Sequence, residues 1–373
     1  MQLSPFMVER WFNEHEFRAK YNIAESCVRP LRVEELLALA GIDDGSGALA
    51  RTRLSYLESD GQPRLRELIA GLYPGASPDN VLVTVGAIEA NFLALAALCG
   101  PGDRVIVTVP TYQQLHEVPR GQGARVDFWH LRPENGWRPD LDELRALLKE
   151  PAKLVVVNFP NNPTGVAVDR AFMSELTALC RERGALLYAD EVYRGLPLAS
   201  DDGQASAWEL LPGECVAVGS LSKAYGLPGL RVGWVVAPRD VRSRAHEIRD
   251  YTSICSPTLS ESLAIAALGA RPAIIAAQRA HARKNLALVE EFLASTDGRL
   301  TWTRPTEGVV GFVRYAADLP SRDFATRLVA ERDTLVVPGD CFGVERHFRL
   351  GFGYETAKLS AGLEQLGKLI HQL

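Results

Sequence analysis

The residues best suited to covalent chemistry surround Lys223, which follows the apolar run CVAVG at 215–219. Two hydroxyls, Ser220 and Ser222, precede the lysine, and Arg231 follows it after the glycine-rich loop AYGLPGL. A lysine desolvated at the end of a buried strand is expected to have a lowered pKa and to attack an aldehyde, forming an imine. The hydroxyls and the guanidinium are suited to bind a phosphate. The segment therefore favours a lysine that captures a phosphorylated aldehyde over a surface lysine with hydroxyl neighbours.

Two further segments carry polar side chains that could bind an aromatic ring. Asp190 ends the apolar run ALLYA at 185–189 and begins the segment DEVY. An unpaired carboxylate at the end of a buried strand is costly, so we expect a cationic partner such as a protonated ring nitrogen. Tyr193 of DEVY could donate a hydrogen bond to a ring oxygen. Asn162 of NFPNNPTG could do the same, because the proline after it keeps its backbone away from helical geometry.

Two more strand ends offer weaker signals. Gly86, Ala87 and Ile88 follow the run NVLVTV at 80–85 and open a helical stretch, whose free backbone N–H groups could bind a phosphate. Tyr112 follows the run RVIVTV at 104–109, where its ring could stack on a flat heteroaromatic ligand. The alternatives are a plain strand-to-helix turn and a tyrosine packed at the rim of the protein.

The elements that must position these residues alternate along the chain. Apolar runs rich in β-branched residues occupy 80–85, 104–109, 125–129, 153–158, 185–189 and 215–219, with helical stretches or loops between them. Runs that are apolar throughout predict a parallel sheet covered by helices on both faces, with ligands at the carboxyl ends of its strands. After the run VGWVVAP, helices are predicted at about 240–250, 257–269 and 272–296, and mixed short strands and helices from about 299 onward indicate a smaller α+β unit.

Composition excludes several other classes of protein. The 373 residues are 47% apolar and 23% charged, with a net charge of −5 and a pI near 5.9, which gives no reason to expect nucleic acid or an anionic membrane as a partner. The six cysteines form no CxxC pair and stand far from metal-ligand spacing, so we expect reduced, mostly buried thiols and no metal site. The charged start of the chain lacks the apolar run of a signal peptide, which favours a cytoplasmic location.

Taken together, the segments SLSKAYGLPGLRVGW, NFPNNPTG and DEVY resemble those of fold-type I enzymes that depend on pyridoxal 5′-phosphate (PLP), and specifically the class I/II aminotransferases. The resemblance covers nearly the whole chain. It implies a mostly parallel seven-stranded sheet in a large domain and a smaller α+β domain. The corresponding predicted ranges are 1–45 for an N-terminal segment that packs with the small domain, 46–284 for the large domain and 285–373 for the small one.

The resemblance also implies a role for each matched residue. Lys223 forms the Schiff base with PLP and acts as the base, Asp190 pairs with the pyridine nitrogen, and Tyr112 stacks on the ring. Asn162 and Tyr193 bind the ring oxygen, and Arg349 in HFRLGFG grips the substrate α-carboxylate beside Asn162. The phosphate is implied to bind Gly86, Ala87, Ile88, Ser220, Ser222 and Arg231. Tyr56, which begins a segment resembling the family's Y-x4-G-x3-LR motif, is implied to reach the phosphate of a neighbouring subunit in a homodimer.

The implied activity is transfer of an amino group between an L-amino acid and a 2-oxo acid. Within the family, LRPENGWRPDLDEL and IRDYTS resemble the capreomycidine synthases, which act on hydroxylated arginine, so the alternative is elimination or cyclisation of an arginine derivative. The segment DEVY favours transamination, because the β-lyase-like branch usually has DEIH and the acyltransferases have DEAH there. A non-catalytic PLP-binding regulator would carry a longer and more basic N-terminus.

The side chain of the substrate is the least determined feature. Three carboxylates in the N-terminal segment, Glu14, Glu16 and Glu25, could hold a basic side chain such as a guanidinium. The alternative interpretation, which composition favours, is a solvated helix face.

Overall fold

The computed structural model describes residues 1–43, 47, 49–199 and 203–373. Its larger part is built on a seven-stranded sheet with the strand order β2-β8-β7-β6-β5-β3-β4. Six of these strands are parallel, and β8 runs antiparallel to both of its neighbours. The strands are β2 (Val81–Thr84), β3 (Arg104–Val109), β4 (Arg125–His130), β5 (Leu154–Asn158), β6 (Leu186–Asp190), β7 (Cys215–Ser220) and β8 (Gly233–Val236). The predicted mostly parallel α/β sheet is thereby confirmed.

The strands are apolar throughout because both faces of the sheet are covered. Successive side chains of a strand point to opposite faces, and each face has its own hydrophobic cluster. In β5, Leu154 and Val156 join the cluster formed with α4 and α9, whereas Val155 and Val157 join the cluster on the other face. The helices of this part are α3 (Pro63–Ala70), α4 (Gly86–Leu98), α5 (Gln114–Gly121), α6 (Leu141–Leu147), α7 (Arg170–Glu182), α8 (Ala207–Leu210), α9 (Arg239–Arg249) and α10 (Thr258–Gly269).

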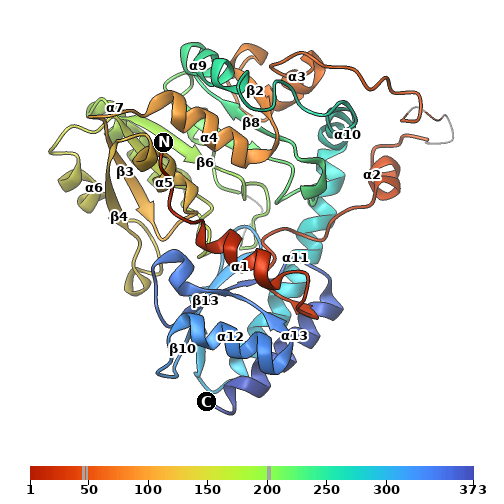
Figure 1. Cartoon of the computed structure of the whole chain (residues 1–373), viewed down its shortest axis with the longest axis vertical. Coiled ribbons are helices and arrows are strands. Elements are labelled where there is room, and N and C mark those ends of the chain that lie inside the picture. Colours follow the sequence, from red (N-terminus) through yellow and green to blue (C-terminus); the bar gives the residue numbers. More distant parts are fainter. Residues whose placement is uncertain (44–46, 48, 200–202) are drawn as a thin grey trace.

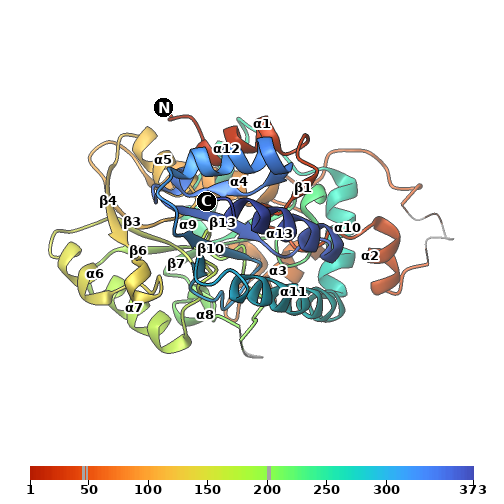
Figure 2. The same cartoon turned by 90° about the horizontal axis from the view of Figure 1, so that it is seen from below.

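A smaller unit lies below this sheet in Figure 1, reached through the long helix α11 (Arg271–Ala294). It contains a four-stranded antiparallel sheet of order β12-β13-β10-β9, with helices on one side (Figure 2). Its elements are β9 (Leu300–Trp302), β10 (Val310–Tyr315), α12 (Ser321–Arg332), β11 (Thr334–Leu335), β12 (Val337–Pro338), β13 (His347–Gly351) and α13 (Thr356–Ile370).

The N-terminal residues contact this smaller unit. They form α1 (Met7–His15), β1 (Tyr21–Asn22) and α2 (Val33–Leu39). β1 pairs in parallel with β11, and the indole Nε1 of Trp11 donates a hydrogen bond to the carbonyl of Val336 at 2.8 Å. The predicted boundary after residue 45 falls on residues outside the described ones, and the boundary after residue 284 falls inside α11; both remain predictions.

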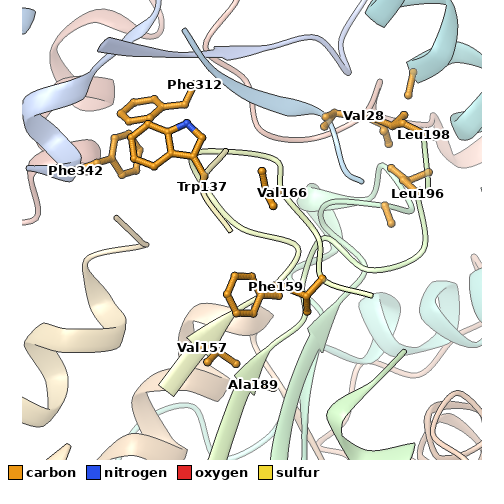
Figure 3. Packing of buried hydrophobic residues seen from close by; sticks show 14 of the residues in the cluster. Val28, Trp137, Val157, Phe159, Val166, Ala189, Leu196, Leu198, Phe312 and Phe342 are labelled. Atoms are coloured by element: carbon orange, nitrogen blue, oxygen red, sulfur yellow. The ribbon is translucent and has the colours of Figure 1, made fainter. Parts of the chain in front are cut away.

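One hydrophobic cluster continues from the large sheet into the smaller unit. Figure 3 shows Val157 and Phe159 at the end of β5, with Trp137 and Phe312 above them. The ring centroids of Trp137 and Phe312 are 5.6 Å apart, and Phe312 lies on β10, the neighbour of β13. This shared core holds β13 over the carboxyl ends of the large sheet, where the predicted site residues are found.

All six cysteines are free, and five of them are buried, as expected. In the part of the chain that the structure describes, no single helix has the length and apolar character needed to cross a membrane. The bent pair α10 and α11 meets that test only when the two helices are taken together.

Candidate active site

A cavity of about 270 Å³ opens where the parallel strands end. β5, β6 and β7 are neighbours in register, and they end in Asn158, Asp190 and Ser220. Because parallel strands end at the same edge of a sheet, these side chains meet there. The predicted site residues that line the cavity are Ala87, Ile88, Tyr112, Asn162, Asp190, Tyr193, Ser220, Ser222, Lys223, Arg231 and Arg349.

Two predicted site residues do not line this cavity. Gly86 packs against Arg231, which does line the cavity. Tyr56 lies apart and is 84% exposed in the single chain. The role predicted for Tyr56 involves the phosphate of a neighbouring subunit, so it remains a prediction.

Asp190 is buried, with 3% of its surface exposed, and its partners are neutral donors. Its Oδ2 accepts a hydrogen bond from Nδ2 of Asn91 at 2.8 Å, and its Oδ1 accepts one from the backbone N–H of Val192 at 3.2 Å. Burial raises the pKa of this carboxyl, and the Asn91 hydrogen bond opposes that rise. A buried carboxylate with neutral partners fits a cationic ligand such as a protonated ring nitrogen.

Sequence reasoning missed Asn91. It lies in α4, and its Oδ1 accepts a hydrogen bond from the Tyr188 hydroxyl at 2.8 Å, which fixes the amide with its N–H groups toward Asp190. The available signal was an asparagine inside an otherwise apolar helix, GAIEANFLALAAL. A polar side chain in such a position must find a buried partner.

A cradle suited to a phosphate lies at the N-terminus of α4. Gly86 has a φ of +77°, and a Cβ built there would lie 2.4 Å from Nη2 of Arg231. A Cβ on Gly233 would lie 2.4 Å from the backbone N of Ala87. Two glycines thus allow the turn, the arginine and the next strand to approach closely. The helix N-terminus, two buried hydroxyls and a guanidinium form a donor set that fits a phosphate; the hydroxyls belong to Ser220 and Ser222.

Lys223 faces the cavity from the loop after β7. Its Nζ donates a hydrogen bond to Oγ of Ser26 at 2.7 Å and lies 3.7 Å from Sγ of Cys27. It also lies 5.7 Å from the centroid of the Tyr193 ring. These contacts bring the amine beside Tyr193, one of the residues predicted to bind the ring.

The expected lowering of the Lys223 pKa is wrong. Burial does lower the pKa, but charge interactions with the nearby Cys27 and Tyr193 outweigh it and raise the pKa above its usual value. The expectation treated the lysine as desolvated alone, whereas the fold brings ionisable groups from two other segments beside it.

Arg349, on β13, is 2% exposed and faces the same cavity. Its Nη1 donates to Oδ1 of Asn162 at 3.0 Å, and its Nη2 donates to the carbonyl of Ala24 at 2.9 Å. Within the described residues, its Nε is buried without a hydrogen-bond partner. A buried guanidinium with neutral partners and an unused donor fits an anionic ligand such as a carboxylate.

The N-terminal segment contributes residues to the cavity that sequence reasoning did not identify: Val8, Glu9, Phe12, Ser26 and Cys27. Oε1 of Glu9 accepts a hydrogen bond from the Tyr112 hydroxyl at 3.0 Å, and the Phe6 ring lies 4.8 Å from the Tyr112 ring. Tyr112 is therefore held in place by α1 and the residues just before it. These side-chain types carry no local signal, because the contacts depend on where the segment docks.

The three carboxylates considered for a basic substrate side chain divide into two groups. Glu14 points away, with 68% of its side chain exposed and its Oε1 3.8 Å from His15. Glu16 instead lies beside Glu25 and Glu9, and burial together with these like charges raises its pKa to about 7. Glu9, which lines the cavity, therefore takes the place of Glu14 in this acidic group, whereas Glu16 and Glu25 lie next to the cavity without lining it.

Comparison with known proteins agrees with this geometry. The family model described as aminotransferase class I and II matches residues 37–366. The capreomycidine synthase of Streptomyces vinaceus is 38% identical over 369 residues, covering 96% of this chain and 93% of that protein. The arginine–pyruvate transaminase of Pseudomonas aeruginosa is 32% identical and covers 79% of this chain and 77% of that protein.

Solved structures extend the similarity to the whole fold. A PLP-dependent aminotransferase from Streptococcus suis superposes with a TM-score of 0.95 at 39% identity, covering 100% of this chain and 99% of that one. The PLP-dependent cyclase OrfR superposes with a TM-score of 0.92 at 32% identity, covering 100% and 98%. The chain therefore belongs to the class I and II aminotransferases and has pyridoxal 5′-phosphate as its cofactor.

Proposed function

We propose that this protein is an aminotransferase that moves an amino group between an L-amino acid and a 2-oxo acid. The observation that carries the proposal is the arrangement of three groups around one cavity: the Lys223 amine, the buried Asp190 carboxylate and the buried Arg349 guanidinium. Tyr193 lines the same cavity, and the segment DEVY that contains it favours transamination.

In this proposal the chain holds the cofactor at both ends. The turn Gly86–Ile88, with Ser220, Ser222 and Arg231, holds the phosphate. Asp190 holds the ring nitrogen in its protonated form, supported by Asn91. The bound cofactor supplies an electron-withdrawing ring that weakens the Cα–H bond of the substrate.

The remaining residues position the substrate and move its proton. Arg349 binds the α-carboxylate through its guanidinium, with Asn162 beside it. That anchor directs the Cα–H bond toward the Lys223 amine, which takes the proton and later returns it. Glu9 and Phe12 of α1 line the same cavity.

We further propose a homodimer in the cytoplasm. Tyr56 is almost fully exposed in the single chain, which supports a role at the phosphate of a neighbouring subunit. Six free cysteines suit a reducing compartment.

A second candidate is elimination or cyclisation of an arginine derivative. The observation that favours it is the acidic group Glu9, Glu16 and Glu25 beside the cavity, because like charges held together invite a cationic side chain. Similarity to a capreomycidine synthase, a PLP-dependent cyclase and an arginine–pyruvate transaminase supports a guanidinium-bearing substrate in either reaction.

The test is a spectroscopic titration of the purified protein. The visible absorption band of lysine-bound PLP is expected in the wild type and absent from Lys223→Ala. A panel of amino acids that includes L-arginine and 3-hydroxyarginine is then added, followed by a 2-oxo acid. Transamination predicts that one amino acid bleaches the band and that the oxo acid restores it.

The other outcomes separate the candidates. A cyclised or deaminated product, formed without transfer of the amino group to an oxo acid, would replace transamination with the second candidate. A wild-type band that persists unchanged in Lys223→Ala would overturn the assignment of the lysine.

A further inference from the structure

A short stretch of the N-terminal segment, residues 25–29, packs closely against the loop after Lys223 and against β13 and the residues that follow it. We call it the strap. Three glycines leave room for its backbone, because a Cβ on each would strike a strap carbonyl at a distance no real contact shows. The collisions would occur between Gly351 and Glu25 O at 1.7 Å, Gly353 and Cys27 O at 2.4 Å, and Gly226 and Arg29 O at 2.6 Å.

The strap and the residue just before it contact both groups that would handle the substrate. The backbone N–H of Val28 donates to the carbonyl of Lys223 at 3.3 Å, so the strap holds the main chain of the lysine. Just before the strap, the carbonyl of Ala24 accepts the hydrogen bond from Arg349. The strap and Ala24 therefore connect the backbone of Lys223 with the guanidinium of Arg349.

The Ser26 side chain is directed at the reacting atom itself. Its hydroxyl oxygen accepts a hydrogen bond from Lys223 Nζ at 2.7 Å, a length typical of a hydrogen bond from a charged donor. The carbonyls of Glu25 and Cys27, on either side of Ser26, lie against glycines, so the backbone that carries the hydroxyl has little room to move away.

We propose that Ser26 is a positioning residue for Lys223: its hydroxyl holds the ammonium that forms when the amine takes the proton from the substrate Cα. The step transfers one proton from carbon to nitrogen, and the hydroxyl accepts a hydrogen bond without itself gaining or losing a proton. This inference rests on the proposed role of Lys223 as the base.

The proposal makes two rates respond in opposite directions. Without the Ser26 hydroxyl, the ammonium loses an acceptor, so more of the amine is free at a given pH. Capture of PLP by the apoenzyme requires the free amine and becomes faster, by about tenfold for a one-unit change in pKa. Removal of the Cα proton requires a strong base and becomes slower, by roughly threefold to tenfold. The other titratable or charged groups that face the amine are Glu25, Cys27, Tyr193, Asp190 and Arg349.

The experiment compares Ser26→Ala with the wild type as full-length protein. Apoenzyme is mixed with PLP at several pH values, and covalent capture is followed by visible absorbance. The PLP-loaded protein is separately incubated with L-arginine in D2O, and exchange of the Cα hydrogen is followed by NMR. Ser26→Thr retains a hydroxyl and should restore both rates, whereas Ser174→Ala, a serine on the exposed face of α7, should change neither.

Faster capture with slower exchange in Ser26→Ala supports the proposal. Slowing of both rates would show a structural defect and overturn it, and two unchanged rates would overturn it as well. Absence of exchange with L-arginine in the wild type would count against the guanidinium-bearing substrate alone, since PLP capture still decides the role of Ser26. Absence of capture in the wild type would count against the proposed function itself.

Discussion

Replacing Gly86 with alanine should weaken PLP binding and, by a separate and comparable free energy, destabilise the fold. Gly86 has a φ of +77°, and the new methyl group would lie 2.4 Å from Nη2 and 3.1 Å from Cζ of Arg231. The end of an arginine side chain is flexible, so the guanidinium is expected to move aside rather than the backbone. That movement removes one donor from the proposed phosphate site.

The two consequences are separate free energies of comparable size. Loss of a hydrogen bond between charged partners costs about 1.5–3 kcal/mol, which corresponds to PLP binding weakened by roughly 10- to 150-fold. An alanine in the left-handed region costs about 1–2 kcal/mol of folding free energy. For the apoenzyme this corresponds to a melting temperature lowered by a few degrees, on the order of 2–4 °C for each kcal/mol.

A matched control separates strain from ligand binding. Gly102 has a φ of +87° with nothing within 4 Å of a built Cβ, so Gly102→Ala carries the same backbone strain far from the site. PLP dissociation constants from absorbance titration, together with melting curves of both apoenzymes, complete the comparison. The reasoning is refuted if Gly86→Ala binds PLP as tightly as the wild type, or if Gly102→Ala weakens PLP binding equally.

Three further predictions concern other parts of the site. The Glu16 carboxyl has a pKa of about 7, so it becomes charged as the pH rises through that value. The KM for L-arginine should therefore fall between pH 6 and 8 relative to the KM for L-alanine. Glu16→Gln should abolish this pH dependence. Asn91→Ala removes the hydrogen-bond partner of Asp190 Oδ2 and of the Tyr188 hydroxyl, both buried. It should therefore destabilise the apoenzyme by about 1–3 kcal/mol in thermal unfolding, and an unchanged melting temperature would contradict this. Mixing inactive Tyr56→Ala with inactive Lys223→Ala should restore about a quarter of wild-type activity in randomly formed dimers, and no recovery after subunit exchange would exclude a shared site.

Much of the fold and part of the site could be predicted because the signals are local. Strands such as β5 and β7 are apolar along their whole length since both faces are buried, and this pattern is visible in the sequence. Asp190 and Ser220 end such strands, so their place at one edge of the sheet follows from the parallel order of the strands.

Other features depended on contacts between distant parts of the chain. Ser26 and Lys223 are 197 residues apart, and they meet only because the N-terminal segment docks against β11 and β13. The raised pKa of Lys223 has the same origin, since Cys27 is brought beside the amine by that docking.

The sequence by itself determined the family and predicted the chemistry of the loop around Lys223 and of the proposed phosphate turn, because these rest on residue types at short spacing. Only the tertiary structure decided which side chains complete the site. The strap, Glu9 and Asn91 reach the cavity because separate segments pack together, and that packing depends on the shape of the whole core rather than on any local pattern.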